Sequence, residues 1–98
     1  MGATISLKTE HSAKETRAFI GEAIEKRIDY IQIRMNKFKN ECRIFEERYN
    51  MISEDFIKKF ETGELGDDVH WFDWYAAYRG RELWQKKNEI LAGISWNE

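Results

Sequence analysis

Proline is absent from this 98-residue sequence, and glycine occurs only six times. Because proline breaks the interior of a helix and glycine weakens it, the two residues that most often interrupt helices are nearly missing. Charged residues make up 35% of the chain, which is typical of helices with one solvated face. The length supports one domain, residues 1–98, with a small core. We therefore predict a single all-α domain.

Cysteine is equally scarce, because Cys42 is the only one, which excludes a disulfide within the chain. It lies on an apolar helix seam, where we expect it to be buried as a small hydrophobic residue. No apolar run reaches the roughly 20 residues of a membrane span, and no signal peptide is recognisable. We therefore expect a soluble cytoplasmic protein.

Positive charge is not in excess either. The net charge is −2 and the sequence pI is about 5.8, whereas a general nucleic-acid binder carries a basic face or a high pI. We therefore expect no nucleic-acid binding by this chain alone.

The first eleven residues carry only weak signals. Ile5 and Leu7 alternate with polar residues, so residues 1–11 are interpreted as a flexible tail or a short strand. Gly2 after Met1, with Ser6 four residues on, matches the myristoylation pattern. A pattern this short is met by chance, so we expect no lipid anchor.

A long helix over residues 12–50 is the strongest feature of the sequence. Ser12 followed by Glu15 forms a capping-box pattern at its start, and Asn50 tolerates the left-handed conformation of a C-terminal cap. Apolar residues recur there at spacings of four and three, which is a heptad seam for packing against another helix. The seam consists of Ile24, Ile28, Ile31, Met35, Phe38, Cys42, Phe45 and Tyr49. At ~1.5 Å per residue the helix would be roughly 58 Å long.

Two further helices are predicted after it. Ser53 is the expected N-cap of a short helix over residues 53–62, which carries carboxylates in its first turn and an apolar stripe of Phe56, Ile57 and Phe60. Gly63 and Gly66 interrupt the chain next. A third helix over residues 67–94 then follows, with Asp67 or Asp68 as its N-cap.

The third helix has two apolar faces. One face is expected to pack on the long helix, and its members are Phe72, Ala76, Gly80, Leu83, Ile90, Leu91 and Ile94. The other face is aromatic and holds Trp71, Trp74, Tyr75 and Tyr78. The short helix can cover part of this aromatic face. The rings are therefore either a local core or a patch that binds a partner protein.

Negative charge gathers around these aromatic residues. Residues 51–75 carry two lysines against seven carboxylates, a net charge of −5, while residues 11–50 carry +2 and residues 76–98 carry +1. Aromatic rings surrounded by carboxylates suit a basic protein surface, although the charge could also serve only to keep the corner soluble. The candidate partner-binding residues are Phe56, Phe60, Asp67, Asp68, Trp71, Trp74, Tyr75 and Tyr78.

No constellation for catalysis is recognisable. The two histidines are His11 in the tail and His70 beside the aromatic face, and neither has an identifiable nucleophile beside it. His70 and nearby aspartates could in principle bind a metal, but a second His or Cys is missing and carboxylates at a helix start commonly act as caps. We expect no enzyme, no cofactor and no metal.

Residues 48–84 contain a block with a distinctive pattern. It reads Tyr49-Asn50-Met51, Ser53-Glu54-Asp55-Phe56, Lys59-Phe60-Glu61, Gly63-Glu64-Leu65-Gly66-Asp67-Asp68, Trp71-Phe72-Asp73-Trp74-Tyr75 and Leu83. The block resembles one shared by small helical bacterial and archaeal proteins encoded beside putative toxins, the antitoxin-like partners of TumE-type toxins. The chain departs from that block at His70, where an acidic residue is usual, and at Ala76-Ala77, where bulkier residues occur. The resemblance implies a non-enzymatic neutraliser that binds a basic toxin.

The predicted architecture is an antiparallel hairpin of two long helices bridged by the short one. Because two helices cannot enclose a core alone, we expect a homodimer that forms a helical bundle. The expected dimer seam consists of Ile20, Ile24, Ile31 and Phe38. An alternative function is a structural or adaptor coiled-coil homodimer with no toxin partner.

Overall fold

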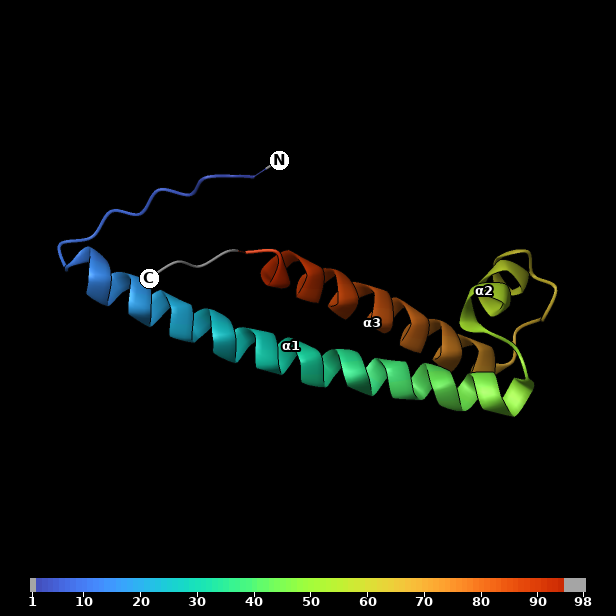
Figure 1. The fold of residues 1–98 in the computed structure, drawn as a ribbon. Helices are drawn as coiled ribbons and strands as arrows, with labels where there is room; N and C mark the ends of the chain where they lie inside the picture. Colours follow the sequence, from blue (N-terminus) through green and yellow to red (C-terminus); the bar gives the residue numbers. More distant parts are fainter. Residues whose placement is uncertain (1, 95–98) are drawn as a thin grey trace.

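The computed structural model describes residues 2–94, and over that range the chain forms three helices and no strand. They are α1 (Ala13–Tyr49), α2 (Ser53–Glu61) and α3 (Val69–Ala92). Figure 1 shows α3 running back along α1, with α2 packed at the end where the chain turns. The predicted all-α hairpin of two long helices with a short bridging helix is confirmed.

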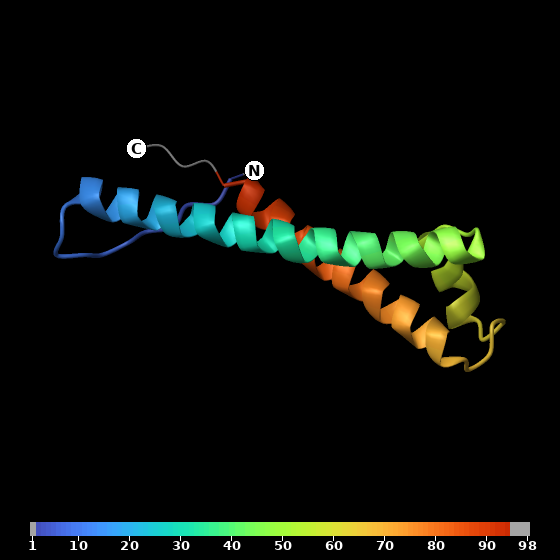
Figure 2. The ribbon, with the colours of Figure 1, turned by 90° about the horizontal axis from the view of Figure 1, so that it is seen from below.

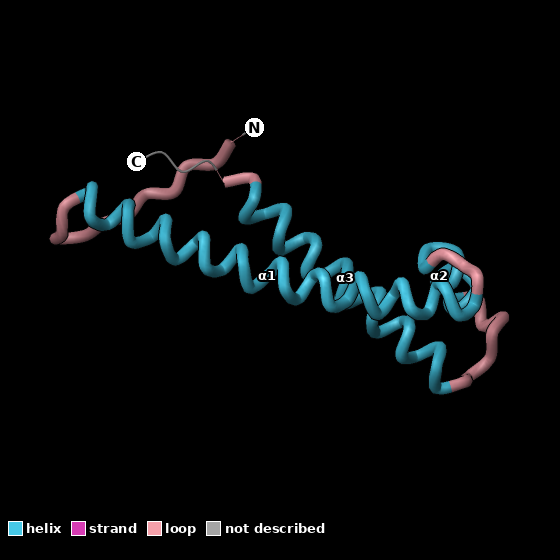
Figure 3. Tube along the Cα trace, turned by 60° about the horizontal axis from the view of Figure 1, so that its bottom comes forward, coloured by secondary structure: helices cyan, strands magenta, loops and turns pink. Residues whose placement is uncertain are grey.

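The molecule is elongated rather than round. Its principal extents are 59 × 24 × 19 Å and its radius of gyration is 19.2 Å, against roughly 13 Å for a compact chain of this length. Residues 2–11 form an exposed loop before the start of α1, so the short strand is not formed there (Figure 3). Met1 of the myristoylation pattern lies outside the described residues.

The helix ends follow the sequence signals closely. The Ser12 side chain accepts a hydrogen bond from the Glu15 backbone N–H (3.1 Å), and Asn50 adopts the left-handed conformation at φ 50° and ψ 51°. At the start of α3, the Asp68 carboxylate accepts from the His70 backbone N–H (2.8 Å). Only α2 differs, since Ile52 occupies its cap position without a side-chain bond and Ser53 is the first helical residue.

The core is concentrated at one end of the hairpin. Among the described residues, the buried hydrophobic side chains are Ile31, Cys42, Phe56, Trp74 and Ala77. All except Ile31 lie in the half of the hairpin where α2 joins the two long helices. Figure 2 shows that α3 crosses α1 at an angle, so the helices separate toward that end and α2 fills the space between them.

Gly80 permits the close approach of the two long helices. A Cβ atom at this position would lie 2.5 Å from the Phe38 ring, which is far inside normal van der Waals contact. Any larger residue would therefore force the ring or the helix to move. The expectation that Gly80 faces the long helix is confirmed.

Apart from Gly80 and Leu91, the face of α3 that packs on α1 is not the predicted one. Phe72 is 51% exposed, Leu83 51% and Ile90 60%, so the predicted core face points mainly to solvent. The face toward α1 is instead a stripe at spacings of three and four, formed by Trp74, Ala77, Arg81, Trp84, Asn88 and Leu91. The indole rings bring more apolar area into contact than Leu and Ile would, which favours burying the stripe that carries two tryptophans.

Candidate interaction surface

The aromatic corner, where the three helices meet, is built around Trp74. The indole is fully buried and stacks on Phe56, with ring centroids 4.0 Å apart and an interplanar angle of 3°. Phe45 and Tyr49 of α1 stack on it at 5.6 and 5.7 Å. The indole N–H donates to the Ser53 hydroxyl (2.9 Å). Trp74 and Phe56 are therefore core residues and offer no surface to a partner.

The other predicted aromatic residues remain partly exposed. Trp71 packs on Tyr49 at 4.8 Å and donates its indole N–H to the Leu65 carbonyl (3.1 Å), which fixes the loop before α3. Phe60 of α2 contacts the Tyr75 ring at 5.1 Å. Tyr78 lies beside the Arg81 guanidinium, and burial raises the pKa of its hydroxyl. Four of the six predicted aromatic residues are thus partly exposed.

We call this half-exposed set the α2-side surface. It consists of Phe60, Trp71, Tyr75 and Tyr78. Phe72 borders it, and its ring is perpendicular to the Phe60 ring with 5.2 Å between the ring centroids. The sequence predicts Phe72 on the core face instead. Of the six aromatic residues predicted for the surface, four thus lie on it, and Phe72 is added at its border.

Carboxylates flank the residues of the α2-side surface in the sequence. Asp67, Asp68 and Asp73 are exposed, and the salt bridges identified within residues 2–94 engage none of the three. Asp68 is occupied as the α3 cap. The charges of these carboxylates are not neutralised by an ion pair, so they can act on a molecule that approaches from solvent.

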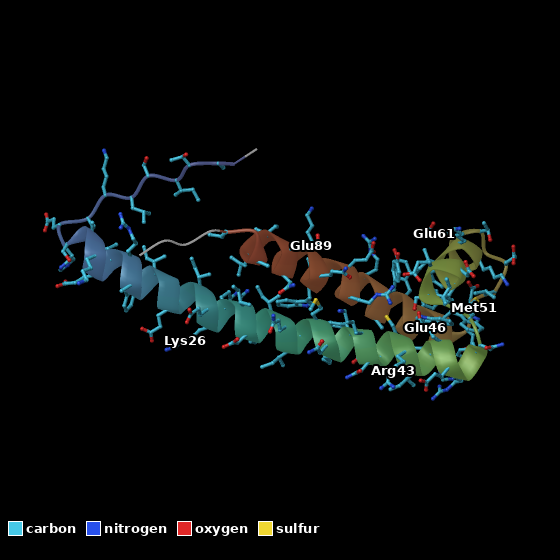
Figure 4. The ribbon with its side chains drawn as sticks, in the orientation of Figure 1. Lys26, Arg43, Glu46, Met51, Glu61 and Glu89 are labelled. Atoms are coloured by element: carbon cyan, nitrogen blue, oxygen red, sulfur yellow. The ribbon has the colours of Figure 1, made fainter. Side chains whose placement is uncertain are left out.

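A polar network beneath the corner was not recognised from the sequence. The Glu46 carboxylate accepts from the Ser53 backbone N–H (2.8 Å) and points into the junction of the three helices (Figure 4). Arg81 of α3 lies 4.0 Å from Glu46 and donates to Glu54 (2.8 Å). One guanidinium therefore ties α3 to both α1 and α2. The spacing of Arg81 from Trp74 and Ala77, seven and four residues, was the signal that could have placed it on the inner face.

Cys42 lies within this network. Its side chain is fully buried, and burial raises the pKa of the thiol against smaller lowering effects of Arg81 and the Ser53 hydroxyl. A neutral buried thiol is a packing group rather than a nucleophile. The expected burial of Cys42 is confirmed.

The four residues of the predicted dimer seam have different surroundings in the structure. Ile31 is only 2% exposed, so it has no area left for a second copy. Phe38 lies against Gly80 of the same chain. Ile20 and Ile24 are half-buried near the start of α1. Ile31 and Phe38 therefore belong to the packing within the hairpin, because α3 occupies the seam that they form.

A long apolar stripe, the outer face of α3, stays exposed. Val69, Ala76, Leu83 and Ile90 repeat at seven-residue intervals along it, and Ile94 lies beyond its end. Val69 is 64% exposed and Ile90 60%. Seven-residue repeats of this kind are typical of contacts between helices.

Sites for chemistry are not apparent in the described part of the chain. Within residues 2–94 no group of three or more His, Cys, Asp or Glu side chains is arranged to hold a metal. An open hollow along α3 is lined mainly by charged side chains, among them Lys39, Glu54 and Glu89. It holds no pair of a nucleophile and a base. No helix among the described residues is long and apolar enough to cross a membrane.

Comparison with known protein families, curated proteins and solved structures finds no match for this chain.

Proposed function

We propose that this protein is a non-enzymatic binding protein whose α2-side surface docks a basic protein, and that it acts as the antitoxin-like neutraliser of a TumE-type toxin. The observation that supports this most directly is the exposure of several aromatic rings beside unpaired carboxylates. Phe60, Tyr75 and Tyr78 remain partly open although Trp74 and Phe56 fill the core beneath them. Residues 48–84 resemble a block of the antitoxin-like partners of TumE-type toxins, and this resemblance implies that the basic partner is a toxin.

The chemistry of the surface favours a basic partner. Tyr and Trp are enriched among the residues that dominate binding energies, because a rigid ring buries a large area with little loss of conformational freedom. The exposed Asp67 and Asp68 would attract lysines and arginines and raise the association rate. The rings therefore provide affinity, and the carboxylates provide steering.

The surface is also held rigidly from below. Trp74 is stacked on Phe56 and bonded to Ser53, and the Trp71 indole is bonded to the loop carbonyl of Leu65. A preorganised surface loses little conformational entropy when a partner binds. The buried residues of the aromatic corner thus support binding by holding the surface above them rigid.

The proposal is tested with the product of a reading frame next to this protein's own gene. We expect that product to be toxic alone and to bind this chain. Tyr75→Ala should weaken binding by about 2 kcal/mol, as truncation of a central aromatic anchor does. Reversing Asp67 and Asp68 to lysine should mainly slow association and flatten its salt dependence.

Ile33→Ala is the matched control, since Ile33 is 67% exposed on α1. It should bind like the parent. If Tyr75→Ala and the aspartate reversals bind unchanged, the α2-side surface is not the contact. If the neighbouring product is neither toxic nor bound by this chain, the proposal of a toxin partner is refuted.

A second candidate is the structural or adaptor homodimer. The exposed outer face of α3 favours it, because that face suits another helix and carries no feature specific to a toxin. Binding of the neighbouring product through the α2-side surface separates the two candidates.

A further inference from the structure

Positive charge gathers around Trp84, where α1 and α3 lie side by side. The Cζ atom of Arg34 lies 5.5 Å from the centre of the indole ring, and the Nζ atom of Lys87 lies 4.8 Å from it. Tyr30 packs edge-on against the same ring, with 5.8 Å between the ring centroids, and the Cζ atom of Arg27 lies 5.1 Å from the centre of the Tyr30 ring. Three cations from two helices are therefore connected through two aromatic rings.

These three cations have no counter-ion within the described chain. The salt bridges identified in residues 2–94 engage none of them, and the buried Nε atom of Arg34 has no hydrogen-bond partner there. Like charges around one ring repel one another, so an anion from outside the chain would stabilise the cluster. Because Arg34 lies against both the Phe38 and Trp84 rings, its guanidinium is already ordered and loses little conformational freedom on binding.

The same side of α1 is basic over a longer stretch. At 100° per residue, four cations between residues 19 and 44 lie within about 60° of Tyr30 around the helix axis. They are Lys26, Arg27, Arg34 and Lys37. Glu41 is the one carboxylate of that stretch in the same sector, whereas Glu22 lies outside it. The exposed ion pairs of Glu41 with Lys37 (4.0 Å) and of Glu22 with Lys26 (3.1 Å) are of a kind that contributes little energy, so both lysines can exchange partners.

Large apolar side chains are exposed in the same sector. Phe19 is 74% exposed, Ile33 67% and Ile44 51%, and each lies within about 60° of Tyr30. From Phe19 to Ile44 the sector is roughly 38 Å long at ~1.5 Å per residue. We call this sector, together with Trp84 and Lys87 beside it, the basic stripe. It combines cations, aromatic rings and aliphatic side chains on one side of the hairpin.

This combination of side chains fits the surface of an anionic membrane. Lysine and arginine are attracted to anionic lipid headgroups, tyrosine and tryptophan favour the headgroup level, and aliphatic side chains enter the acyl boundary. A nucleic-acid backbone would engage the cations but would leave Ile33 and Ile44 in water. A straight stripe of this length also suits a flat bilayer, since α1 is one unbroken helix of 37 residues.

We propose that the basic stripe binds the surface of an anionic lipid bilayer, with α1 lying parallel to the membrane plane. Its cations contact lipid phosphates, and Tyr30 and Trp84 lie at the level of the headgroups. Ile33 and Ile44 reach the acyl boundary. The contact is peripheral, because its apolar side chains occupy only one side of the helix.

Membrane binding leaves the α2-side surface free. Lys87 and Tyr78 are nine residues apart, so at 100° per residue they point about 180° apart around α3. Asp67 and Asp68, which an anionic membrane would repel, precede α3 at the opposite end of the hairpin from the start of α1 (Figure 1). The inference therefore does not rest on the proposed function, and variants on α1 test it separately.

Co-sedimentation of the full chain with lipid vesicles tests the proposal. We expect binding to phosphatidylcholine vesicles that contain phosphatidylglycerol, no binding to vesicles of phosphatidylcholine alone, and weaker binding as the salt concentration rises. Arg27→Gln and Lys37→Gln should each lower the affinity about fivefold, because each removes one cation near the membrane surface. Ile33→Ser should also lower the affinity, because it removes apolar area from the contact.

Lys39→Gln is the matched control for the loss of one charge. Lys39 is exposed on the same helix, but it points about 180° away from Tyr30. This variant should bind the vesicles like the parent protein. Circular dichroism should show unchanged helix content in all four variants.

Three results would overturn the proposal. The first is no binding of the parent protein to the anionic vesicles at low salt. The second is a loss of affinity in Lys39→Gln as large as that in Arg27→Gln, which would show that net charge rather than the stripe determines binding. The third is unchanged binding by Ile33→Ser, which would show that the stripe binds polyanions without contacting the acyl boundary.

Discussion

The hydrogen bond between Trp74 and Ser53 provides the sharpest test of the core. Both side chains are fully buried and the donor–acceptor distance is 2.9 Å. Trp74→Phe keeps a ring against Phe56 but removes the donor and part of the ring volume. The lost contacts and the unsatisfied hydroxyl of Ser53 should together lower the free energy of unfolding by about 2–3 kcal/mol. Ser53→Ala should cost about 1–3 kcal/mol, because it leaves the indole N–H buried without an acceptor.

The double variant distinguishes this explanation from simple loss of volume. Once both partners are gone, no buried polar group is left unpaired, so the double variant should be more stable than the sum of the single effects predicts, by about 1 kcal/mol. Urea denaturation followed by circular dichroism measures all four proteins. Trp71→Phe is the control at a half-exposed position and should cost less. Strict additivity of the two core variants would refute the energetic role of the bond, and an unaffected Trp74→Phe would refute the burial of Trp74.

Three further outcomes are expected in denaturation experiments. Gly80→Ala should destabilise the fold by about 1–3 kcal/mol, because its Cβ would meet the Phe38 ring; unchanged stability would show that the helices are not in close contact. Asn88→Leu should stabilise by about 1 kcal/mol, since the buried Asn88 side-chain oxygen has no hydrogen-bond partner, and a loss of stability would reveal a partner. Burial raises the thiol pKa of Cys42 above 9.0, so the neutral thiol stabilises the fold below pH 9.0. This contribution is lost as the pH rises through the folded-state pKa. Cys42→Ala should therefore show a smaller decrease in the free energy of unfolding at alkaline pH than the parent protein.

The first helix could be predicted from the sequence because its local and long-range signals agree. Ser12 and Asn50 mark its ends, and the heptad seam between them contains few polar residues. Ile31 and Cys42, two members of the seam, are buried as expected. Where caps and periodicity specify the same boundaries and the same face, sequence reasoning is reliable.

The packing face of α3 could not be predicted in this way. Arg81 and Asn88 interrupt its inner stripe, so a count of apolar residues favours the opposite face. Arg81 is tolerated there because Glu46 and Glu54 lie within its reach, and both are brought to it by tertiary structure. The partners of this half-buried charge belong to other helices, and the sequence of α3 alone does not reveal them.

The same ambiguity explains why the aromatic corner has two roles. Trp71, Trp74, Tyr75 and Tyr78 were assigned to one cluster, but a helix turns by 100° per residue and presents them to different neighbours. Trp74 points to α1 and stacks there, whereas Tyr75 points to α2. One group of rings thus supplies both the core and the half-exposed surface above it.

A helix with two apolar stripes and one long helix beside it must leave one stripe uncovered. The chain buries the stripe with two tryptophans, since their rings exclude the most water and Gly80 allows α1 to come close. The aliphatic stripe of Val69, Leu83 and Ile90 therefore remains exposed to solvent. Its seven-residue spacing is typical of residues that pack against another helix. On this argument, replacing Leu83, which is 51% exposed, by a polar residue should lower the free energy of unfolding far less than replacing the buried Trp74. The inner stripe therefore contributes most of the folding energy of α3, and the outer stripe contributes little to it.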